Sequence, residues 1–178
     1  MAARCAGSPW TGLRKCYDRL PLRALEQVAQ AVRLPEALWR PMVAAYRLPR
    51  LVRADGLGGE ARVPQCGLAP GCPAATDWLA LVMHAWVLRM RRCAPAVVTR
   101  TYVDDLSAFT QEHGTVEDAA KAWEVTQAFG AAFRLRLNLH KCVRYSTSAA
   151  GRKALQASPG PPVLLSFRDL GVTQRVAR

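Results

Sequence analysis

The order of sequence patterns in this 178-residue chain predicts a mixed α/β (α+β) domain, an antiparallel sheet with helices packed on one face. Short β-branched segments such as "VVTRTYV" (97–103) alternate with longer segments whose apolar residues recur at helical spacing. The composition, 51% hydrophobic and 21% charged, is typical of a folded globular protein. No apolar run approaches the roughly 20 residues of a membrane span, so no membrane partner is expected.

Strand and helix signals follow one another through the first part of the chain. Residues 12–17 can form a strand, and Asp18 can cap a helix over about 20–32, where apolar residues recur every three or four positions. Pro35 opens a second helix, because its fixed φ suits a first helical turn. Residues 50–64 read as two short strands around the turn "DGLGG".

The second part of the chain continues the alternation. The tight loop "GLAPGCP" (67–73) precedes a strongly apolar helix over about 74–90. The strand "VVTRTYV" and the segment "LSAF" (106–109) predict a hairpin, and Thr115 with Asp118 predicts a capping box at the start of a helix over about 115–130. The remaining elements, in order, are a strand "KCVRYST" (141–147), a loop "ASPGPP" (157–162) and strand material in "VLLSFRDLGV" (163–172).

Charge and cysteine content narrow the functional class. The formal net charge is +12, which favours a polyanionic partner such as nucleic acid, although a merely arginine-rich protein is the alternative. The six cysteines form no CxxC pair, and the three histidines are scattered. We therefore expect incidental thiols in a reduced intracellular protein, nuclear or cytoplasmic, and no zinc site. The opening "MAARCAGSPW" has no apolar stretch typical of a secretory signal.

The segment "TYVDDL" (101–106) places two adjacent carboxylates, Asp104 and Asp105, where a β-branched run ends. At the tip of a tight hairpin both carboxylates can approach one point, and they repel unless a cation or a proton lies between them. Hard oxygen ligands of this kind suit Mg²⁺. The alternative is a solvent-exposed Asp-Asp turn, since Asp is common in turns.

Five blocks in one order resemble the palm domain of reverse transcriptases, RNA-directed DNA polymerases. "YVDD" resembles the metal-binding hairpin of that family. The short motifs "KCYD" and "GCP" are most similar to those of the non-LTR retroelement (retrotransposon) type. The resemblance implies an antiparallel sheet of ferredoxin/RRM-like topology. Of the other blocks, "LRKCYDRLPLRAL" (13–25) looks like the first palm strand and its helix, and "GLAPGCPAATDWLALVMHAW" (67–86) looks like the block that lies against the template and the incoming nucleotide. "AFRLRLNLHKC" (132–142) looks like the following block, which ends in a lysine, and "FRDLGV" (167–172) looks like the turn that grips the primer.

The resemblance implies a role for particular residues in a nucleotidyltransferase with two Mg²⁺ ions. Asp104 and Asp105 would hold metal and Lys141 would lie near the leaving pyrophosphate, although Lys141 could also be a solvated lysine on a strand. The nucleotide-binding residues would be Tyr17, the aromatic gate against a 2′-OH, together with Gly67, Gly71 and Tyr102. The primer and template contacts would be Arg89, Arg91, Arg92, Leu170 and Gly171. The alternatives are a core tyrosine, plain turns, and arginines that only complement a helix C-terminus.

Three departures from the family pattern put activity in doubt. The family's first catalytic aspartate lies five positions before the aromatic gate, and that position here is Gly12. Pro70 stands where the family usually carries glutamine. There is little room for fingers before residue 12 and none for a thumb after Gly171, as in a degenerate or truncated copy or a gene model that missed its first exon.

These observations give a divided expectation. Residues 1–11 would be a divergent or truncated segment, and residues 12–178 a palm-like domain with partners of RNA template, DNA primer and dNTP. We expect the chain, though a polymerase by family, to be catalytically impaired. The alternative is a non-catalytic basic nucleic-acid-binding remnant, with an unrelated basic α/β module as a third reading. The sequence leaves the oligomeric state open.

Overall fold

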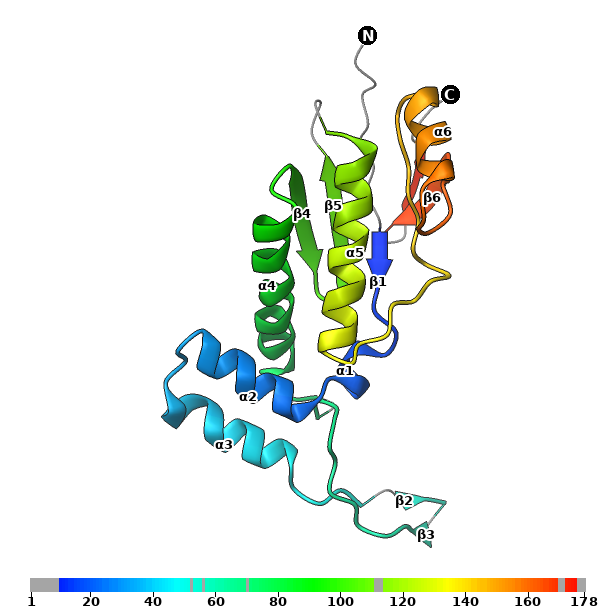
Figure 1. The fold of residues 1–178 in the computed structure, drawn as a ribbon. Helices are drawn as coiled ribbons and strands as arrows, with labels where there is room; N and C mark the ends of the chain where they lie inside the picture. Colours follow the sequence, from blue (N-terminus) through cyan, green and yellow to red (C-terminus); the bar gives the residue numbers. More distant parts are fainter. Residues whose placement is uncertain are drawn as a thin grey trace.

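A sheet of three antiparallel strands lies at the centre of the computed structural model, which describes residues 10–51, 53–55, 57–69, 71–110, 114–169 and 172–175 (Figure 1). The strands, in spatial order, are β1 (Trp10–Gly12), β5 (Asp105–Thr110) and β4 (Val97–Tyr102). The predicted hairpin of "VVTRTYV" and "LSAF" is thus confirmed. Its register runs from the pair Val97↔Thr110 to the pair Tyr102↔Asp105.

Two long helices pack against one face of this sheet. They are α4 (Ala75–Cys93) and α5 (Val116–Ala132), and the indole Nε1 of Trp86 donates to Thr126 Oγ1 across their contact at 3.1 Å. Leu106 and Ala108 of β5 are buried in the same apolar core as these helices. Because strand side chains alternate, the opposite face carries Val98, Arg100, Tyr102, Asp105 and Phe109. We call it the open face.

Among the described residues, three helices and a projecting hairpin precede α4. The helices are α1 (Cys16–Arg19), α2 (Leu22–Ala31) and α3 (Glu36–Tyr46), and the hairpin is formed by β2 (Arg53–Ala54) and β3 (Leu57–Gly58). Figure 1 shows α2 and α3 stacked below the sheet and the β2–β3 hairpin extending away from the domain. The bridge Arg50↔Arg62 closes the base of this hairpin.

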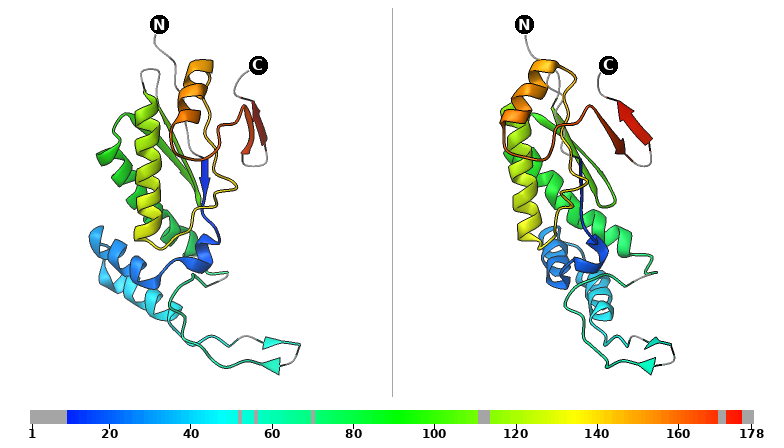
Figure 2. Two further views of the ribbon diagram at one scale, coloured as in Figure 1. Left: turned by 45° about the vertical axis from the view of Figure 1, so that its right-hand side comes forward. Right: turned by 90° about the vertical axis from the view of Figure 1, so that its right-hand side faces the viewer.

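The last described elements are α6 (Ala149–Ala157) and a hairpin of β6 (Ser166–Asp169) and β7 (Val172–Arg175). Figure 2 shows that the β6–β7 hairpin stands apart from the central sheet. The buried guanidinium of Arg144 fixes the loop before it, donating to the carbonyls of Ser158, Pro159 and Pro161 at 2.7–3.1 Å. It also donates to Ser158 Oγ at 2.8 Å.

Most of the predicted elements are confirmed, and the fold is the mixed helix and strand class that the sequence predicts. The helix opened by Pro35, the 50–64 hairpin and the apolar helix after residue 74 are all present. Both bonds of the capping box form, from Asp118 N–H to Thr115 Oγ1 and from Thr115 N–H to Asp118 Oδ2. No described helix has both the length and the apolar character needed to cross a membrane.

The predicted strand 12–17 was wrong in its position. The strand is β1, Leu13 forms only an isolated bridge to Leu137, and Lys15 has a left-handed φ of 50° that turns the chain into α1. Asp18 therefore lies inside α1 and does not cap α2, whose N-cap is Pro21. The first N–H of α2, that of Leu22, donates instead to the Gln65 carbonyl at 3.2 Å.

One further prediction near the C-terminus was wrong, and one helix was missed. Residues 141–147 form no continuous strand: only Val143 and Arg144 take part in isolated bridges, that of Arg144 with Val163, and the Arg144 backbone and side chain are occupied by the 158–164 loop. Helix α6 was not predicted. Its signal was Ser148, whose Oγ accepts a hydrogen bond from Gly151 N–H at 3.0 Å, followed by residues of good helix propensity.

Candidate active site

The two adjacent aspartates lie at the turn between β4 and β5. Asp104 is the second residue of a two-residue turn, and Asp105 is the first residue of β5; both are half-buried. The first turn residue, Val103, has a φ of 55°, which a β-branched side chain rarely adopts. Such a conformation costs on the order of 1–3 kcal/mol, so packing around the turn must hold it in place.

The strand register places position 12 beside this turn. Gly12 is the direct partner of Asp105 across the β1–β5 pair. Directly opposed residues share one face of a sheet, so position 12, Asp105 and Tyr102 all lie on the open face. A side chain at position 12 would start about 5 Å from that of Asp105. The position that the sequence identified as a vacant carboxylate site is therefore next to the remaining carboxylates.

Helix α1 approaches the same turn from below. The thiol of Cys16 is buried, and burial together with the nearby Asp104 carboxylate raises its pKa to about 12. Cys16 is the residue before Tyr17. Tyr17 itself is partly buried against the core, so both the gate reading and the core-tyrosine reading of its ring are consistent with its position.

The loop that contains Gly67 is docked onto α1. Leu68 N–H donates to the Tyr17 carbonyl at 2.8 Å, and Gly67 N–H donates to the Leu20 carbonyl at 2.9 Å. Gly67 has a φ of +91°, and a Cβ there would lie 2.9 Å from the Asp18 carbonyl oxygen. The glycine is thus required by the chain's own backbone. Gly71 also has a positive φ, of +76°, but faces open space.

Two residues that the sequence analysis did not single out hold this loop from the side of α3. Arg50 Nη2 donates to the carbonyls of Gly67 and Tyr46, at 3.2 and 3.3 Å. The buried Tyr46 hydroxyl donates to Cys72 Sγ at 3.0 Å, and burial raises the pKa of this tyrosine. The contacts Arg50–Gly67 and Tyr46–Cys72 span 17 and 26 positions of the sequence, so no local pattern could have indicated them.

The other predicted site residues are not gathered around the aspartates. Arg89, Arg91 and Arg92 are exposed near the C-terminus of α4, which leads into the start of β4, about 17 Å of strand away from the turn. Lys141 is exposed in a turn where its N–H donates to the Asn138 carbonyl, so the strand reading of this lysine was wrong. Leu170 and Gly171, and also Pro70, lie outside the described residues.

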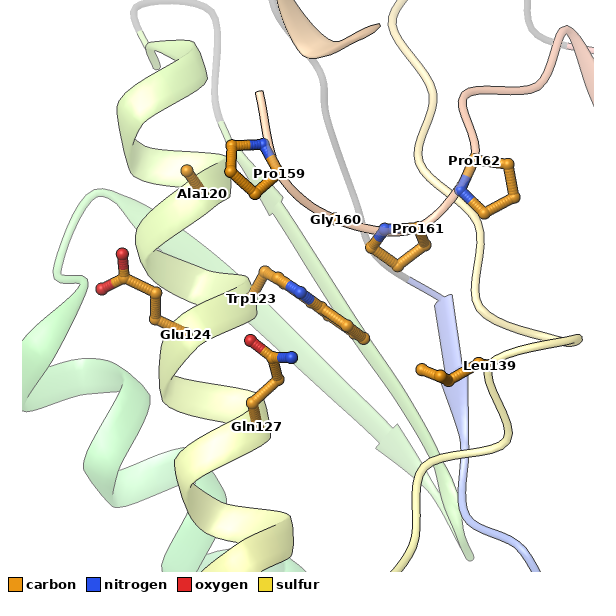
Figure 3. A pocket seen from close by; sticks show the side chains of 9 residues that line it. All are labelled: Ala120, Trp123, Glu124, Gln127, Leu139, Pro159, Gly160, Pro161 and Pro162. Carbon is orange, nitrogen blue, oxygen red and sulfur yellow. The ribbon is translucent and has the colours of Figure 1, made fainter. Parts of the chain in front are cut away.

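A groove on the helix side of the sheet is separate from the open face. It has a volume of about 490 Å³ and lies between α5 and the loop that Arg144 fixes. Figure 3 shows the ring of Trp123 pointing from α5 toward this loop, while Glu124 points away from it. The full lining is Ala120, Trp123, Glu124, Gln127, Leu139, Pro159, Gly160, Pro161 and Pro162.

The described side chains do not form a complete metal clamp. Among them, no group of three or more His, Cys, Asp or Glu residues lies close enough together to hold a metal ion. Asp104 and Asp105 are two carboxylates, and glycine occupies the adjacent position from which a third could come. The donor set is therefore smaller than two-metal phosphoryl chemistry requires.

Comparison with known proteins identifies the family. The family model described as reverse transcriptase (RNA-dependent DNA polymerase) matches residues 12–173, so the chain belongs to this family. The family acts on nucleic acid and nucleotides and generally uses divalent metals. The resemblance that the sequence suggested is thereby confirmed at the family level, while the non-LTR type stays a prediction.

A solved structure shows the same fold. It is described as apo telomerase from Candida Tropicalis truncated from its C-terminal domain, with a TM-score of 0.67 and 15% sequence identity. The match covers 98% of this chain and 35% of that telomerase chain, so this chain spans about a third of its length. A search of curated proteins found no match.

Proposed function

We propose that residues 12–178 are the palm domain of a retroelement reverse transcriptase that binds an RNA–DNA hybrid but, as this chain, does not extend a primer. The observation that carries the proposal is the register of β1, which pairs Gly12 with Asp105. This is the place for a third carboxylate on the open face.

The chemistry explains why this position matters. When bound, two Mg²⁺ ions in this family supply charge stabilisation for the attacking 3′ oxygen and the leaving pyrophosphate. Asp104 and Asp105 would hold such ions only weakly, because Mg²⁺ keeps its waters unless several ligands converge. Loss of a shared ligand costs several kcal/mol of transition-state stabilisation, which is several orders of magnitude in rate.

Binding would use the open face and its surroundings. Arg100 is exposed on this face, with its guanidinium 5.2 Å from the centroid of the Phe109 ring. Tyr102 is 64% exposed beside it, so an aromatic surface and a cation lie next to the aspartate turn. With a net charge of +12, contacts to phosphates would dominate and would carry no sequence preference.

The remaining family roles belong to the same proposal. Tyr17 would pack beneath the sugar, with the Gly67 and Gly71 loop beside the nucleotide. Tyr102 would also contact the nucleotide, and Lys141 would lie near the pyrophosphate. Arg89, Arg91, Arg92, Leu170 and Gly171 would contact primer and template. A nuclear or cytoplasmic location and a non-LTR origin complete this reading.

A non-catalytic nucleic-acid-binding module is the second candidate function, and the same glycine favours it. Both candidates predict an inactive chain, and they differ in whether Gly12→Asp restores any activity. Extension of a labelled primer on an RNA template, with Mg²⁺ and dNTPs, separates them: feeble extension by Gly12→Asp supports the palm domain, and no extension by either protein supports the binding module. We expect no extension by the chain as given, and robust extension would contradict the assignment of Gly12 as the vacant position.

Binding is tested separately, by titration of a fluorescent RNA–DNA hybrid at several salt concentrations. We expect log K to fall linearly with log[salt]. Arg100→Gln should weaken binding, whereas Lys121→Gln on α5, behind the sheet, should leave it within about twofold because Lys121 pairs with Glu124 at 3.0 Å. Equal losses in both variants would show that the open face is not the contact surface.

A further inference from the structure

Two segments that are distant in the sequence meet beside β1 and bring basic residues together. The chain after α5 returns past β1 and α1 (Figure 1), where Leu13 and Leu137 form an antiparallel bridge. One residue further along, Arg14 N–H donates to the Arg136 carbonyl at 2.8 Å. We call the four basic residues at this contact the basic cluster: Arg14, Lys15, Arg134 and Arg136.

The alternation of side chains places Arg14 and Arg136 on the open face. Leu13 and Leu135 are both only 4% exposed and belong to the apolar core, and Leu137 packs against the same core. Arg14 and Arg136 are exposed, as the neighbours of core residues in extended chain are expected to be. The two arginine side chains therefore start on the open face, about 5 Å from each other.

The charge of the basic cluster is not neutralised by any described acidic residue. Its four cations supply one third of the net charge of +12. The ion pairs among the described residues involve other cations, namely Arg40, Arg47 and Lys121. Like charges that face each other directly across two segments repel. The pair of Arg14 and Arg136 is therefore suited to an anion bound between the two guanidinium groups.

Backbone strain at the other two positions of the basic cluster supports a functional role. Lys15 has a φ of 50° and Arg134 a φ of 53°, in the left-handed region that glycine adopts without penalty. A residue with a Cβ is strained there. Arg134 also follows Phe133, the C-cap of α5, at a position where glycine is typical. Cations thus occupy two positions where glycine would be more stable, and strained residues are concentrated at functional sites.

Glycine at position 12 keeps this part of the open face positive. Gly12 and Arg14 are two residues apart, so side chains at these positions would share one face at a distance of about 7 Å. Because residue 12 is glycine, β1 places no carboxylate beside Arg14. Asp105 is the partner of Gly12, and Asp104 adjoins it in the turn. The four cations of the basic cluster outnumber these two carboxylates.

We propose that the basic cluster binds phosphate groups of a nucleic-acid strand directly, with no divalent ion between protein and phosphate. This inference rests on the proposed function and names the contact that anchors the nucleic acid. An arginine guanidinium binds phosphate oxygens through two parallel hydrogen bonds, and this geometry needs no metal. The chain would thus hold nucleic acid even though its carboxylates hold metal only weakly.

A strand is a better ligand than a free nucleotide because the cations of the open face are widely spaced. Arg100 lies in register with Trp10, since both are partners of Ser107. Arg100 and Arg14 are therefore two strand spacings apart across the sheet and four residues apart along it, a Cα separation of about 16 Å. A nucleic-acid strand has a phosphate for about every 3.4 Å of its axis, so several phosphates cover this distance. A nucleotide would reach only one end of it.

The test is titration of a fluorescent RNA–DNA hybrid with the full chain in EDTA, at several salt concentrations. The variant is Arg14→Gln with Arg136→Gln, which removes two exposed charges and keeps the backbone hydrogen bond between these residues. We expect the affinity to fall at least about tenfold. The slope of log K against log[salt] should become smaller in magnitude by roughly 1.5–2, since each duplex phosphate contact contributes roughly 0.9.

The matched control is Arg33→Gln with Lys153→Gln, which removes the same charge at two exposed positions outside the basic cluster. Arg33 follows α2, and Lys153 lies within α6. The control should change the salt slope by less than about 0.5. Circular dichroism spectra and melting temperatures of both double variants should match those of the unaltered chain, because all four side chains are exposed.

The outcomes separate this inference from the proposed function. Absence of hybrid binding by the unaltered chain would overturn both. Hybrid binding that is equal in the unaltered chain and in Arg14→Gln with Arg136→Gln, with the same salt slope, would overturn this inference alone. Binding that requires Mg²⁺ would also overturn it, because a metal would then bridge protein and phosphate. Displacement of the hybrid by micromolar tripolyphosphate would make a free polyphosphate the ligand in place of a strand.

Discussion

Replacement of Gly12 by aspartate provides a direct test of the site geometry, independent of catalysis. The substitution adds a carboxylate on the open face, about 5 Å from that of Asp105 across the β1–β5 pair. Two carboxylates at this separation repel each other, and at an effective dielectric constant between 20 and 80 the repulsion is about 1–3 kcal/mol. The variant should therefore be less stable than the unaltered chain without divalent metal.

The measurable effect is a change in melting temperature. In a domain of this size, 1 kcal/mol corresponds to roughly 2–4 °C, so Gly12→Asp should melt about 2–12 °C lower in EDTA at neutral pH. The repulsion raises the folded-state pKa of one carboxyl above its unfolded value, so the penalty arises as pH rises through that pKa. Below the ordinary carboxyl pKa of about 4 it should disappear.

A divalent cation should reverse the loss, because it binds the folded three-carboxylate site. At a concentration of about 100 times its Kd, the ion would return about 2.7 kcal/mol. The assay is differential scanning fluorimetry in EDTA and in Mg²⁺ or Mn²⁺. Gly12→Asn is the matched control, since it has the same shape without the charge, and it should show no metal-dependent shift.

The reasoning fails if Gly12→Asp melts identically with and without metal while remaining folded. It also fails if the unaltered chain shows the same metal-dependent stabilisation, because Asp104 and Asp105 would then suffice. In primer extension, Gly12→Asp should at most give feeble activity, and Gly12→Asp with Asp104→Asn should give none.

Three further outcomes follow from the structure. Gly67→Ala should lower the free energy of unfolding by about 2 kcal/mol or more, and Gly71→Ala by about 1 kcal/mol, because of these two glycines only Gly67 combines a positive φ with a close backbone contact. Equal denaturant midpoints of the two variants would contradict this expectation. Arg144→Met should lower the free energy of unfolding by about 2–4 kcal/mol, because the 158–162 loop loses its buried hydrogen-bond donors. The control Lys153→Met, at an exposed position, should lower it by less than about 0.5 kcal/mol, and urea unfolding measures both variants. Because the folded Cys16 thiol keeps its proton up to a pKa of about 12, the stability it contributes is complete below pH 9 and lost as pH rises toward 12; Cys16→Ala should flatten that decline in melts taken from pH 8 to 11.

The sequence by itself determined the family and the location of the reactive turn. The "YVDD" segment, the Thr115–Asp118 capping box and the apolar 74–90 helix depend on residues close together in the chain, so local pattern sufficed for them. The order of the motif blocks along the chain indicated the family. Because each block is a local signal, its reading survived errors in the secondary structure between blocks.

Only the tertiary structure decided where position 12 lies. Pairing of β1 with β5 joins residues more than 90 positions apart, and a shift of one residue would have moved Gly12 to the helix-covered face. Likewise, the strained Val103, the Asp18 carbonyl that requires Gly67 to be glycine and the Arg50 contact to that loop depend on packing between distant segments. Periodicity in a sequence specifies which side of an element is apolar, but it does not specify what that side will meet.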